Sequence, residues 1–258
     1  MNSGDFSRRT FLTTLAGAAV ATPALLDIRA ADELPQSSGK RLKIVCVGGH
    51  PDDPESSSAG TLARYAAAGH AVTIIYLTRG ERGINGKSLD EAAAIRTREC
   101  EEACRIIGAK AVFAGQIDGA TELNRGRVQQ MRELLGAEKP DLIFTHWPID
   151  THLDHQIASL LVLQSTLQIA PRPEIYFFEV DTGSQTQGFS PNTYVDVSTV
   201  LEKKKAALLA HESQNGEAIW RQHHEPVAIF RGREAGVSAA EAFVRLTRLP
   251  GKRPLPGA

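Results

Sequence analysis

The sequence predicts an α/β fold, a Rossmann-like three-layer structure whose mostly parallel sheet has the strand order 3-2-1-4-5. Three observations predict it. From residue 41 onward, short apolar runs alternate with helical segments, which is typical of βαβ units. Crossovers in such units are right-handed almost without exception, so few topologies remain. Polar loops follow the strands expected to be first, second and fourth. In the expected order, strands 1 and 4 are neighbours, and the order of the strands reverses between them. Ligands of such sheets bind in the crevice at the carboxyl ends of these two strands.

Each element follows from its local pattern. The unbroken apolar run 42–47 suits a strand buried on both faces, and the segment 72–77 is β-branched and strand-like. The remaining expected strands are 111–113, 141–145 and 174–178. The expected helices are the alanine-rich 57–68, the long 89–107 with Gly108 as its stop, 125–135, a helix from His152 or Asp154 to residue 167, and the lysine-rich 200–210.

Three segments are expected along the chain: an export signal at 1–31, a linker at 32–40 and a catalytic domain at 41–258. Arg8-Arg9, a weak apolar stretch and small residues near Ala30 have the order of a secretory signal. The arginine pair resembles the twin-arginine (Tat) consensus, which predicts the Tat translocase as a partner and a periplasmic or extracellular location. The alternative is a tail whose arginines occur by chance. No stable membrane span is expected after cleavage, because the apolar stretch is shorter than ~20 residues.

Composition allows a full core and excludes several partner classes. The chain has 258 residues, of which 42% are hydrophobic, and a formal net charge of −1. Without a basic excess, nucleic acid is not an expected partner. Three cysteines are too few for a disulfide framework.

The end of the first expected strand carries an unusual concentration of ionisable residues. His50, Asp52 and Asp53 lie within four positions, with Pro51 and Pro54 between and after them. In the simplest structural interpretation, Asp53 caps a helix that begins at Pro54, and Asp52 is solvated. That interpretation does not explain why a histidine and two carboxylates lie together at the point where the strand order reverses. Buried charge is costly unless it is paired or binds a metal.

A second group follows the fourth strand, where His152 and His155 are three residues apart and share a helix face. A surface pair is the commoner explanation for such spacing alone. Catalytic zinc, however, has three protein ligands from histidine and carboxylate and one open position. Taken with the first group, the pattern predicts a metal site of two histidines and one aspartate.

These segments resemble the PIG-L/LmbE-like deacetylase family. The stretch His50 to Glu55 (HPDDPE) resembles its HPDDxE motif, and Asp150 to His155 (DTHLDH) resembles its D-x-H-x-D-H motif. Further matches are Thr78 to Gly83 (TRGERG), Arg98-Glu99, and His211 to Gln214 (HESQ), so the resemblance covers roughly residues 41–215. It implies zinc-dependent hydrolysis of an N-acyl group, commonly the N-acetyl of an amino sugar.

The resemblance also implies residue roles. His50, Asp53 and His155 match the metal ligands, Asp52 matches the general base, and His152 matches the group that stabilises the transition state. His152 is expected to be protonated for this role. Two further carboxylates, Asp150 and Asp154, are expected behind the histidines: Asp154 to keep His152 charged and Asp150 to orient a metal ligand, with either assignment left open.

Several alternatives remain open at this stage. Arg79 could bind substrate or be a surface arginine. Zn2+ is expected as the cofactor, while Fe2+, Mn2+ and Co2+ are not excluded. The expected substrate is a small molecule or glycan with an N-acetyl amino sugar. Alternatives are an amidase acting on a thiol or peptide conjugate, and a non-catalytic sugar-binding module of the same fold.

Overall fold

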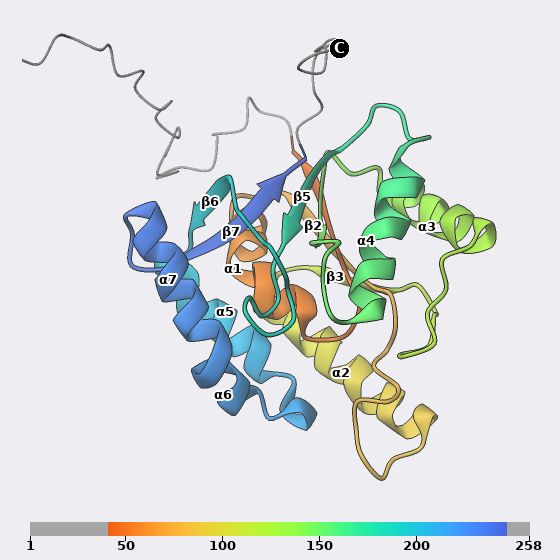
Figure 1. The fold of residues 1–258 in the computed structure, drawn as a ribbon, viewed down its shortest axis with the longest axis horizontal. Coiled ribbons are helices and arrows are strands. Elements are labelled where there is room, and N and C mark those ends of the chain that lie inside the picture. The colour runs from red at the N-terminus through yellow and green to blue at the C-terminus, as the bar shows by residue number, and fades with distance from the viewer. Residues whose placement is uncertain (1–40, 247–258) are drawn as a thin grey trace, which may run out of the picture.

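The computed structural model describes residues 41–246 and shows one sheet covered by helices (Figure 1). The strand order is β3-β2-β1-β4-β5-β7-β6. The first five strands pair in parallel in the predicted order, and β7 and β6 extend the sheet with antiparallel pairing. The predicted fold class is confirmed, and the antiparallel extension is an addition to it.

The elements have the following bounds. The strands are β1 Lys43–Gly48, β2 Ala71–Tyr76, β3 Lys110–Phe113, β4 Leu142–His146, β5 Glu174–Phe178, β6 Thr193–Asp196 and β7 Ala240–Arg245. The α-helices are α1 Asp53–Ala67, α2 Leu89–Ile107, α3 Arg125–Glu138, α4 Leu153–Thr166, α5 Leu201–Leu209, α6 Gly216–Ile219 and α7 Glu225–Ala235. A π-helix, Trp220–His224, joins α6 to α7, and short 3-10 turns lie at Ser198–Val200 and Glu212–Gln214.

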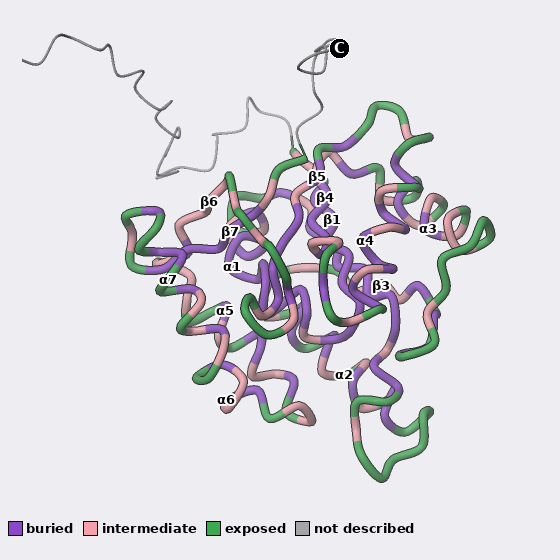
Figure 2. Tube along the Cα trace, in the orientation of Figure 1, coloured by how far each residue is buried: buried purple, intermediate pink, exposed green. Residues whose placement is uncertain are grey.

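The core has one layer on each face of the sheet, and Figure 2 shows the central strands buried. Successive side chains of a strand point to opposite faces. In β1, Ile44 and Cys46 pack into the cluster that includes residues of α1 and α2, whereas Val45 and Val47 pack into the cluster that includes residues of α3 and α4. Because both faces are covered, the strands read as continuous apolar runs rather than alternating ones.

Helix α1 begins earlier than the sequence predicts. Its first residue is Asp53 rather than residue 57, and its N-cap is Asp52 rather than Asp53. Pro54 lies in the first turn, where its missing N–H leaves no helical hydrogen bond unmade. Twelve of the fifteen residues of α1 are buried. The helix was placed too late because its first turn contains the charged residues that build the site.

Buried Glu241 ties β7 to α5 through an ion pair and to α1 through backbone hydrogen bonds. Glu241 accepts hydrogen bonds from Lys204 Nζ at 2.6 Å, Gly60 N at 2.9 Å and Thr61 N at 2.7 Å. A Cβ at Gly60 would lie 2.6 Å from Val197 Cγ1, so glycine permits this close approach. The lysine-rich helix therefore buries one of its lysines instead of exposing them all.

The structure does not test the predictions for the first 40 residues. The expected signal at 1–31 and the linker at 32–40 lie outside the described residues. Within the described part of the chain, none of the helices has the length and apolar character that crossing a bilayer requires.

Candidate active site

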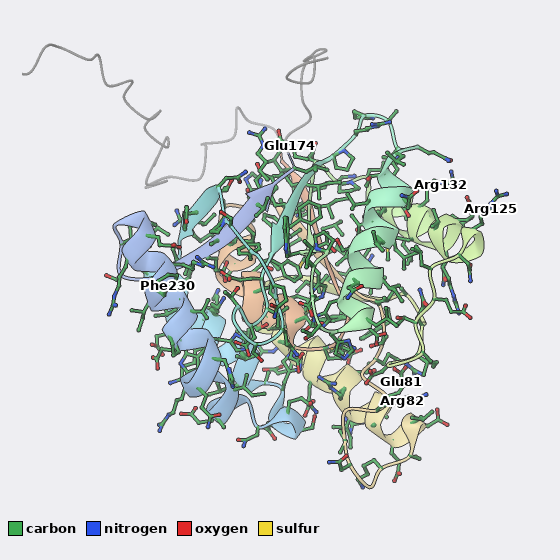
Figure 3. The ribbon with its side chains drawn as sticks, viewed as in Figure 1. Glu81, Arg82, Arg125, Arg132, Glu174 and Phe230 are labelled. Atoms are coloured by element: carbon green, nitrogen blue, oxygen red, sulfur yellow. The ribbon has the colours of Figure 1, made fainter. Side chains whose placement is uncertain are left out.

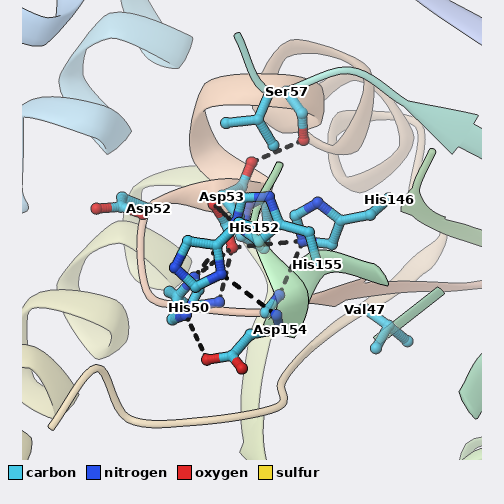
Figure 4. Close-up of polar contacts among 12 residues, drawn as sticks. Val47, His50, Asp52, Asp53, Ser57, His146, His152, Asp154 and His155 are labelled. Atoms are coloured by element: carbon cyan, nitrogen blue, oxygen red, sulfur yellow. Dashed lines mark hydrogen bonds and ion pairs between the residues drawn. The ribbon is translucent and has the colours of Figure 1, made fainter. Parts of the chain in front are cut away.

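The predicted polar loops meet at the carboxyl ends of β1 and β4. They border a cavity of about 470 Å³, which is also lined by residues from the C-terminal helices. Figure 4 shows side chains from the loop after β1 and from the start of α4 converging at this point. The location agrees with the switch point expected from the strand order.

Four side-chain atoms from three residues surround one point in the manner of a metal site. His50 Nδ1 lies 3.2 Å from Asp53 Oδ2, His155 Nε2 lies 3.3 Å from Asp53 Oδ1, and the two ring nitrogens are 3.3 Å apart. Ligand atoms about 2.0 Å from a tetrahedral ion have mutual distances of about this length. All three residues are buried. The donor set therefore fits a zinc ion with one coordination position left for water or substrate.

Carboxylates behind the two rings orient them. His50 Nε2 lies 3.0 Å from Asp154 Oδ2, which also accepts a hydrogen bond from Gly119 N. His155 Nδ1 lies 3.2 Å from Asp150 Oδ1. A carboxylate on the outer nitrogen fixes the tautomer and leaves the inner nitrogen free for a metal. Asp150 thus has the expected position, but Asp154 orients His50 rather than His152.

The electrostatics favour a positive charge between these ligands. Burial acts to lower the pKa of His155, but Asp53 and Asp150 outweigh it and raise the pKa to about 9. The pKa of His50 is also raised despite burial, because its ring can donate hydrogen bonds to the carboxylates of Asp118, Asp154 and Asp53. The pKa of Asp53 is held well below its usual value by the facing imidazoles, against the effect of burial. A bound cation would take the place of the protons on these rings.

His146 also contacts this centre but is not available as a ligand through Nε2. This nitrogen accepts a hydrogen bond from Gly49 N at 2.9 Å and lies 3.3 Å from Asp53 Oδ2. Burial and the neighbouring His155 lower the pKa of His146 to about 4, which keeps the ring neutral and able to accept. Asp53, His146 and His155 are close enough to hold a metal in principle. The backbone hydrogen bond favours the His50, Asp53 and His155 set over the set that contains His146.

Asp52 turns away from its neighbour Asp53 and faces the cavity. Its backbone has φ 94°, a conformation that costs about 1–3 kcal/mol for a residue with a side chain. Arg96 Nη2 donates to Asp52 Oδ2 at 2.8 Å and also to the Pro51 carbonyl. Burial raises the pKa of Asp52, with Arg96 opposing this effect. A carboxylate held in this way beside the metal ligands is suited to accept a proton.

Arg96 is a site residue that the sequence analysis missed. Only 4% of its side chain is exposed, although it carries a permanent charge. It packs against two glycines of the TRGERG stretch: a Cβ would lie 2.3 Å from Arg96 Nη1 at Gly80 and 2.4 Å at Gly83. The two glycines therefore leave the space that the guanidinium group needs to reach Asp52.

His152 lies at the cavity as the N-cap of α4, with a protonation state that differs from the expected one. Burial, followed by the charges of His50 and His155, lowers its pKa, which favours a neutral ring in this structure, whereas the sequence analysis expects a protonated one. Its Nδ1 accepts a hydrogen bond from Asp154 N at 3.3 Å. In the neutral ring the proton is therefore on Nε2, which can still donate to an oxygen atom.

Arg79 does not reach the cavity. Its Nε donates to Glu81 Oε1 at 3.2 Å, and 41% of its side chain is exposed. Glu81 also accepts from Asp118 N and so holds the loop after β3 in place. Arg82, which is labelled beside Glu81 in Figure 3, lines the cavity, whereas Arg79 does not. The cavity arginines from this region of the fold are thus Arg82 and Arg96.

The remaining motif residues support the site from behind. Glu55, fully buried, accepts hydrogen bonds from Tyr76 Oη and from Asp52 N, and His211 Nε2 lies 3.5 Å from it. Glu99 accepts from both the backbone and the hydroxyl of Ser213 at 2.7 Å. The HESQ segment therefore contacts both Glu99 of α2 and Glu55 of the HPDDPE segment.

A further part of the cavity lining comes from a later part of the chain. Its residues are Val180, Asp181, Gln185, Leu208, Gln214, Ile219, His223 and His224. The sequence analysis gave none of these residues a role at the site, although Gln214 belongs to the HESQ match. Their only signal was the adjacent His223-His224 pair.

This chain is similar in sequence and in structure to several known proteins. A family model described as "PIG-L: GlcNAc-PI de-N-acetylase" matches residues 45–166. Diacetylchitobiose deacetylase of Thermococcus kodakarensis is 28% identical over 220 residues, which cover 78% of this chain and 82% of that protein. A 4-oxalmesaconate hydratase of Pseudomonas putida is 25% identical over 221 residues, 77% of this chain and 84% of the other. The solved structure of N,N'-diacetylchitobiose deacetylase from Pyrococcus horikoshii is similar with a TM-score of 0.71 and 26% identity, over 86% of this chain and 90% of that one.

Proposed function

We propose that this chain, whose residues 45–166 match the PIG-L family model, is an exported, zinc-dependent hydrolase that removes the N-acetyl group of an amino-sugar-containing substrate. One observation carries the proposal: His50, Asp53 and His155 converge with ligand atoms 3.2–3.3 Å apart, next to Asp52. The relatives named diacetylchitobiose deacetylase support an N-acetylated amino sugar as the substrate class.

The residues of the site fit the steps of amide hydrolysis. When bound at the three ligands, zinc would supply a Lewis acid that polarises the amide carbonyl and makes water more acidic. Asp52 accepts the proton of the attacking water and later delivers a proton to the departing amine nitrogen. His152 Nε2–H donates to the carbonyl oxygen as negative charge develops on it. Arg96 fixes the Asp52 carboxylate throughout.

The test is acetate and free-amine release from a panel of N-acetylated sugars, alone, phosphorylated and glycan-linked. We expect release by metal-loaded protein, loss with a chelator and recovery with a divalent metal. Metal content provides a second readout: about one ion should bind per chain, and His155→Ala should bind none. Zn2+, Fe2+, Mn2+ and Co2+ should be compared, because affinity and availability both select the working metal.

Other activities are outcomes of the same experiment. Amine release from acylated peptides or thiol conjugates, with none from sugars, would indicate an amidase. Stoichiometric metal without turnover on any substrate would indicate a binding module. The hydratase relative raises water addition to 4-oxalmesaconate as a further activity.

We also propose export by the Tat route, on the basis of Arg8-Arg9 and the segments that follow. An exported deacetylase would meet wall or extracellular glycans or their fragments. Replacement of both arginines by lysine should stop export of the mature protein, which fractionation and immunoblotting would detect. Unchanged export of that variant would contradict the Tat assignment.

A further inference from the structure

A second cavity, of about 510 Å³, lies at the end of the sheet opposite the metal ligands. Leu42, Leu142 and Glu174 line it, and these residues lie at the amino ends of β1, β4 and β5. Five of its lining side chains are aromatic: Tyr65, Phe144, Tyr176, Tyr194 and Phe243. We call this cavity the aromatic groove. It lies on the face of the sheet that α1 covers, because the core cluster on that face includes Tyr65, Phe144 and Phe243.

The rings of the groove offer apolar surface rather than free hydroxyl groups. Phe144 stacks on Tyr176 with ring centroids 5.4 Å apart. The Tyr176 hydroxyl donates to Glu174 at 2.9 Å, and the Tyr194 hydroxyl donates to Glu234 at 3.2 Å. Grooves lined by aromatic rings bind proline-rich segments, whose extended helix is already formed before binding. The aromatic groove therefore suits a stiff, apolar peptide segment.

The described chain ends at the edge of this groove. Leu246 N donates to the Ile175 carbonyl at 2.9 Å, and Arg245 Nη2 lies 3.0 Å from Glu174 Oε2. Figure 1 shows the end of β7 at the edge of the sheet where Figure 3 labels Glu174. Residues 247–258 follow directly from this point. At ~3.1 Å per residue, an extended proline-rich segment of this length reaches ~37 Å, which is ample for a groove of this volume.

The sequence of residues 247–258, TRLPGKRPLPGA, has the composition that the groove suits. It contains three prolines, two leucines and three basic residues, and no acidic residue. The charged groups that line the groove are the carboxylates of Asp141 and Glu174 and the guanidinium group of Arg64, which donates to the Asp196 carbonyl. The basic segment thus meets an excess of negative charge.

Residues 32–40, at the other end of the described chain, match the groove less well. Their sequence, ADELPQSSGK without its first alanine, begins with two acidic residues. It has one proline, and Ser-Ser-Gly lies nearest to the first described residue. Acidic residues would face the carboxylates of the groove, and serine and glycine offer little apolar surface to the rings. Residues 247–258 are therefore the better occupant.

We propose that residues 247–258 bind in the aromatic groove of their own chain, with Pro254, Leu255 and Pro256 against the rings and Lys252 and Arg253 near the carboxylates. Binding there covers apolar surface that would otherwise favour association between molecules. The groove and the reacting centre lie at opposite ends of the sheet, so this contact is independent of the proposed deacetylase function.

The first test traps the contact in the full chain with an engineered disulfide. Thr193→Cys is combined with Leu255→Cys, because Thr193 is half-buried on the edge strand β6 and lines the groove. The three native cysteines are buried and should not compete. Mild oxidation should join the two new cysteines within one molecule in most of the protein, as detected by mass spectrometry of tryptic peptides.

The matched control places the partner cysteine on the other side of the sheet. Gln129→Cys combined with Leu255→Cys uses an exposed position of α3, and the cluster that includes residues of α3 lies on the opposite face. This pair should remain mostly reduced. Equal disulfide formation in the two pairs would overturn the proposal. A disulfide from position 193 to a second molecule would assign the groove to another copy of the chain and would also overturn it.

The second test needs no cysteine and follows cleavage by trypsin after Arg248 and Lys252. In the full chain these bonds should be cut at least about tenfold more slowly than in a free peptide of residues 241–258. Glu174→Gln should raise the rate about two- to fivefold, as expected for the loss of one exposed charge pair. Glu133→Gln, which removes an exposed carboxylate on α3, is the control and should leave the rate unchanged.

Equal cleavage rates in the full chain and the free peptide would overturn the proposal, as would equal rates in the two glutamine variants. Acetate release should be the same in all of these variants as in the wild type.

Discussion

Replacing Gly83 by alanine tests whether space around Arg96 controls the catalytic carboxylate. The backbone of Gly83 lies outside the left-handed region, so alanine is compatible with it. The new Cβ would lie 2.4 Å from Arg96 Nη1, whereas ordinary contacts begin at 3.4 Å. Arg96 must therefore move by about 1 Å (3.4 minus 2.4). Its hydrogen bond to Asp52 is 2.8 Å long, and a displacement of this size is enough to break it.

The magnitude follows from the bond that is lost. A hydrogen bond to a charged group contributes about 1.5–3 kcal/mol. If the loss appears in full in the transition state, kcat/KM falls by about ten- to a hundredfold, at ~1.36 kcal/mol per factor of ten. A misplacement of about 1 Å is known to cost rates of this order. Metal affinity should not change, because neither Gly83 nor Arg96 contacts a ligand atom in the described structure.

The assay is acetate release, measured beside metal content and thermal unfolding. Gly136→Ala is the control, since a Cβ at that exposed helical position meets nothing within 4 Å. We expect Gly136→Ala to match the wild type in kcat/KM. An unchanged kcat/KM in Gly83→Ala, with full metal content, would show that the contact between Arg96 and Asp52 does not position the base.

Three further predictions concern single residues. Asp52→Asn should retain its metal by elemental analysis and lose about 10²–10⁴ in kcat, since it is nearly isosteric but cannot act as a base; loss of metal would mean that Asp52 is a ligand. Asp154→Asn should weaken metal affinity about 10–100-fold in a chelator competition, because His50 loses its orienting carboxylate; unchanged affinity would contradict this role. Lys204→Met should destabilise the fold by about 3 kcal/mol, the low end for a broken buried pair because Glu241 keeps two backbone donors. At ~2–4 °C per kcal/mol, Tm should fall by about 6–12 °C, and a smaller change than ~2 °C would contradict the argument.

The order of the five parallel strands was predictable because each strand is buried on both faces. A run such as Val45 to Val47 has no polar residue to interrupt it, and the polar loops then mark the ends of the strands. Strands β6 and β7 were not predicted. β6 is only half-buried along its length, and β7 contains the buried Glu241, so neither has the pattern of a central strand.

The site was predictable only in part, for a different physical reason. His50, Asp53 and His155 belong to two short segments whose spacing already indicates a metal site. Arg96 could have been noticed, because it lies on the buried face of α2 between Ala93 and Cys100, where a charge needs an explanation. No local pattern could have predicted the pairing of Asp181 with His223, because it depends on how distant segments pack.

At position 52, the residue that best stabilises the fold differs from the residue that the reaction needs. Position 52 combines a conformation that L-residues rarely adopt, with φ 94°, and a carboxylate next to that of Asp53. Asparagine tolerates the same backbone and can still accept a hydrogen bond from Arg96 without the second negative charge. A variant library screened for thermal stability alone should therefore accumulate asparagine here and lose turnover without any sign of it in the screen. Stabilised versions of this protein need a selection that reports on the reaction as well as on the fold.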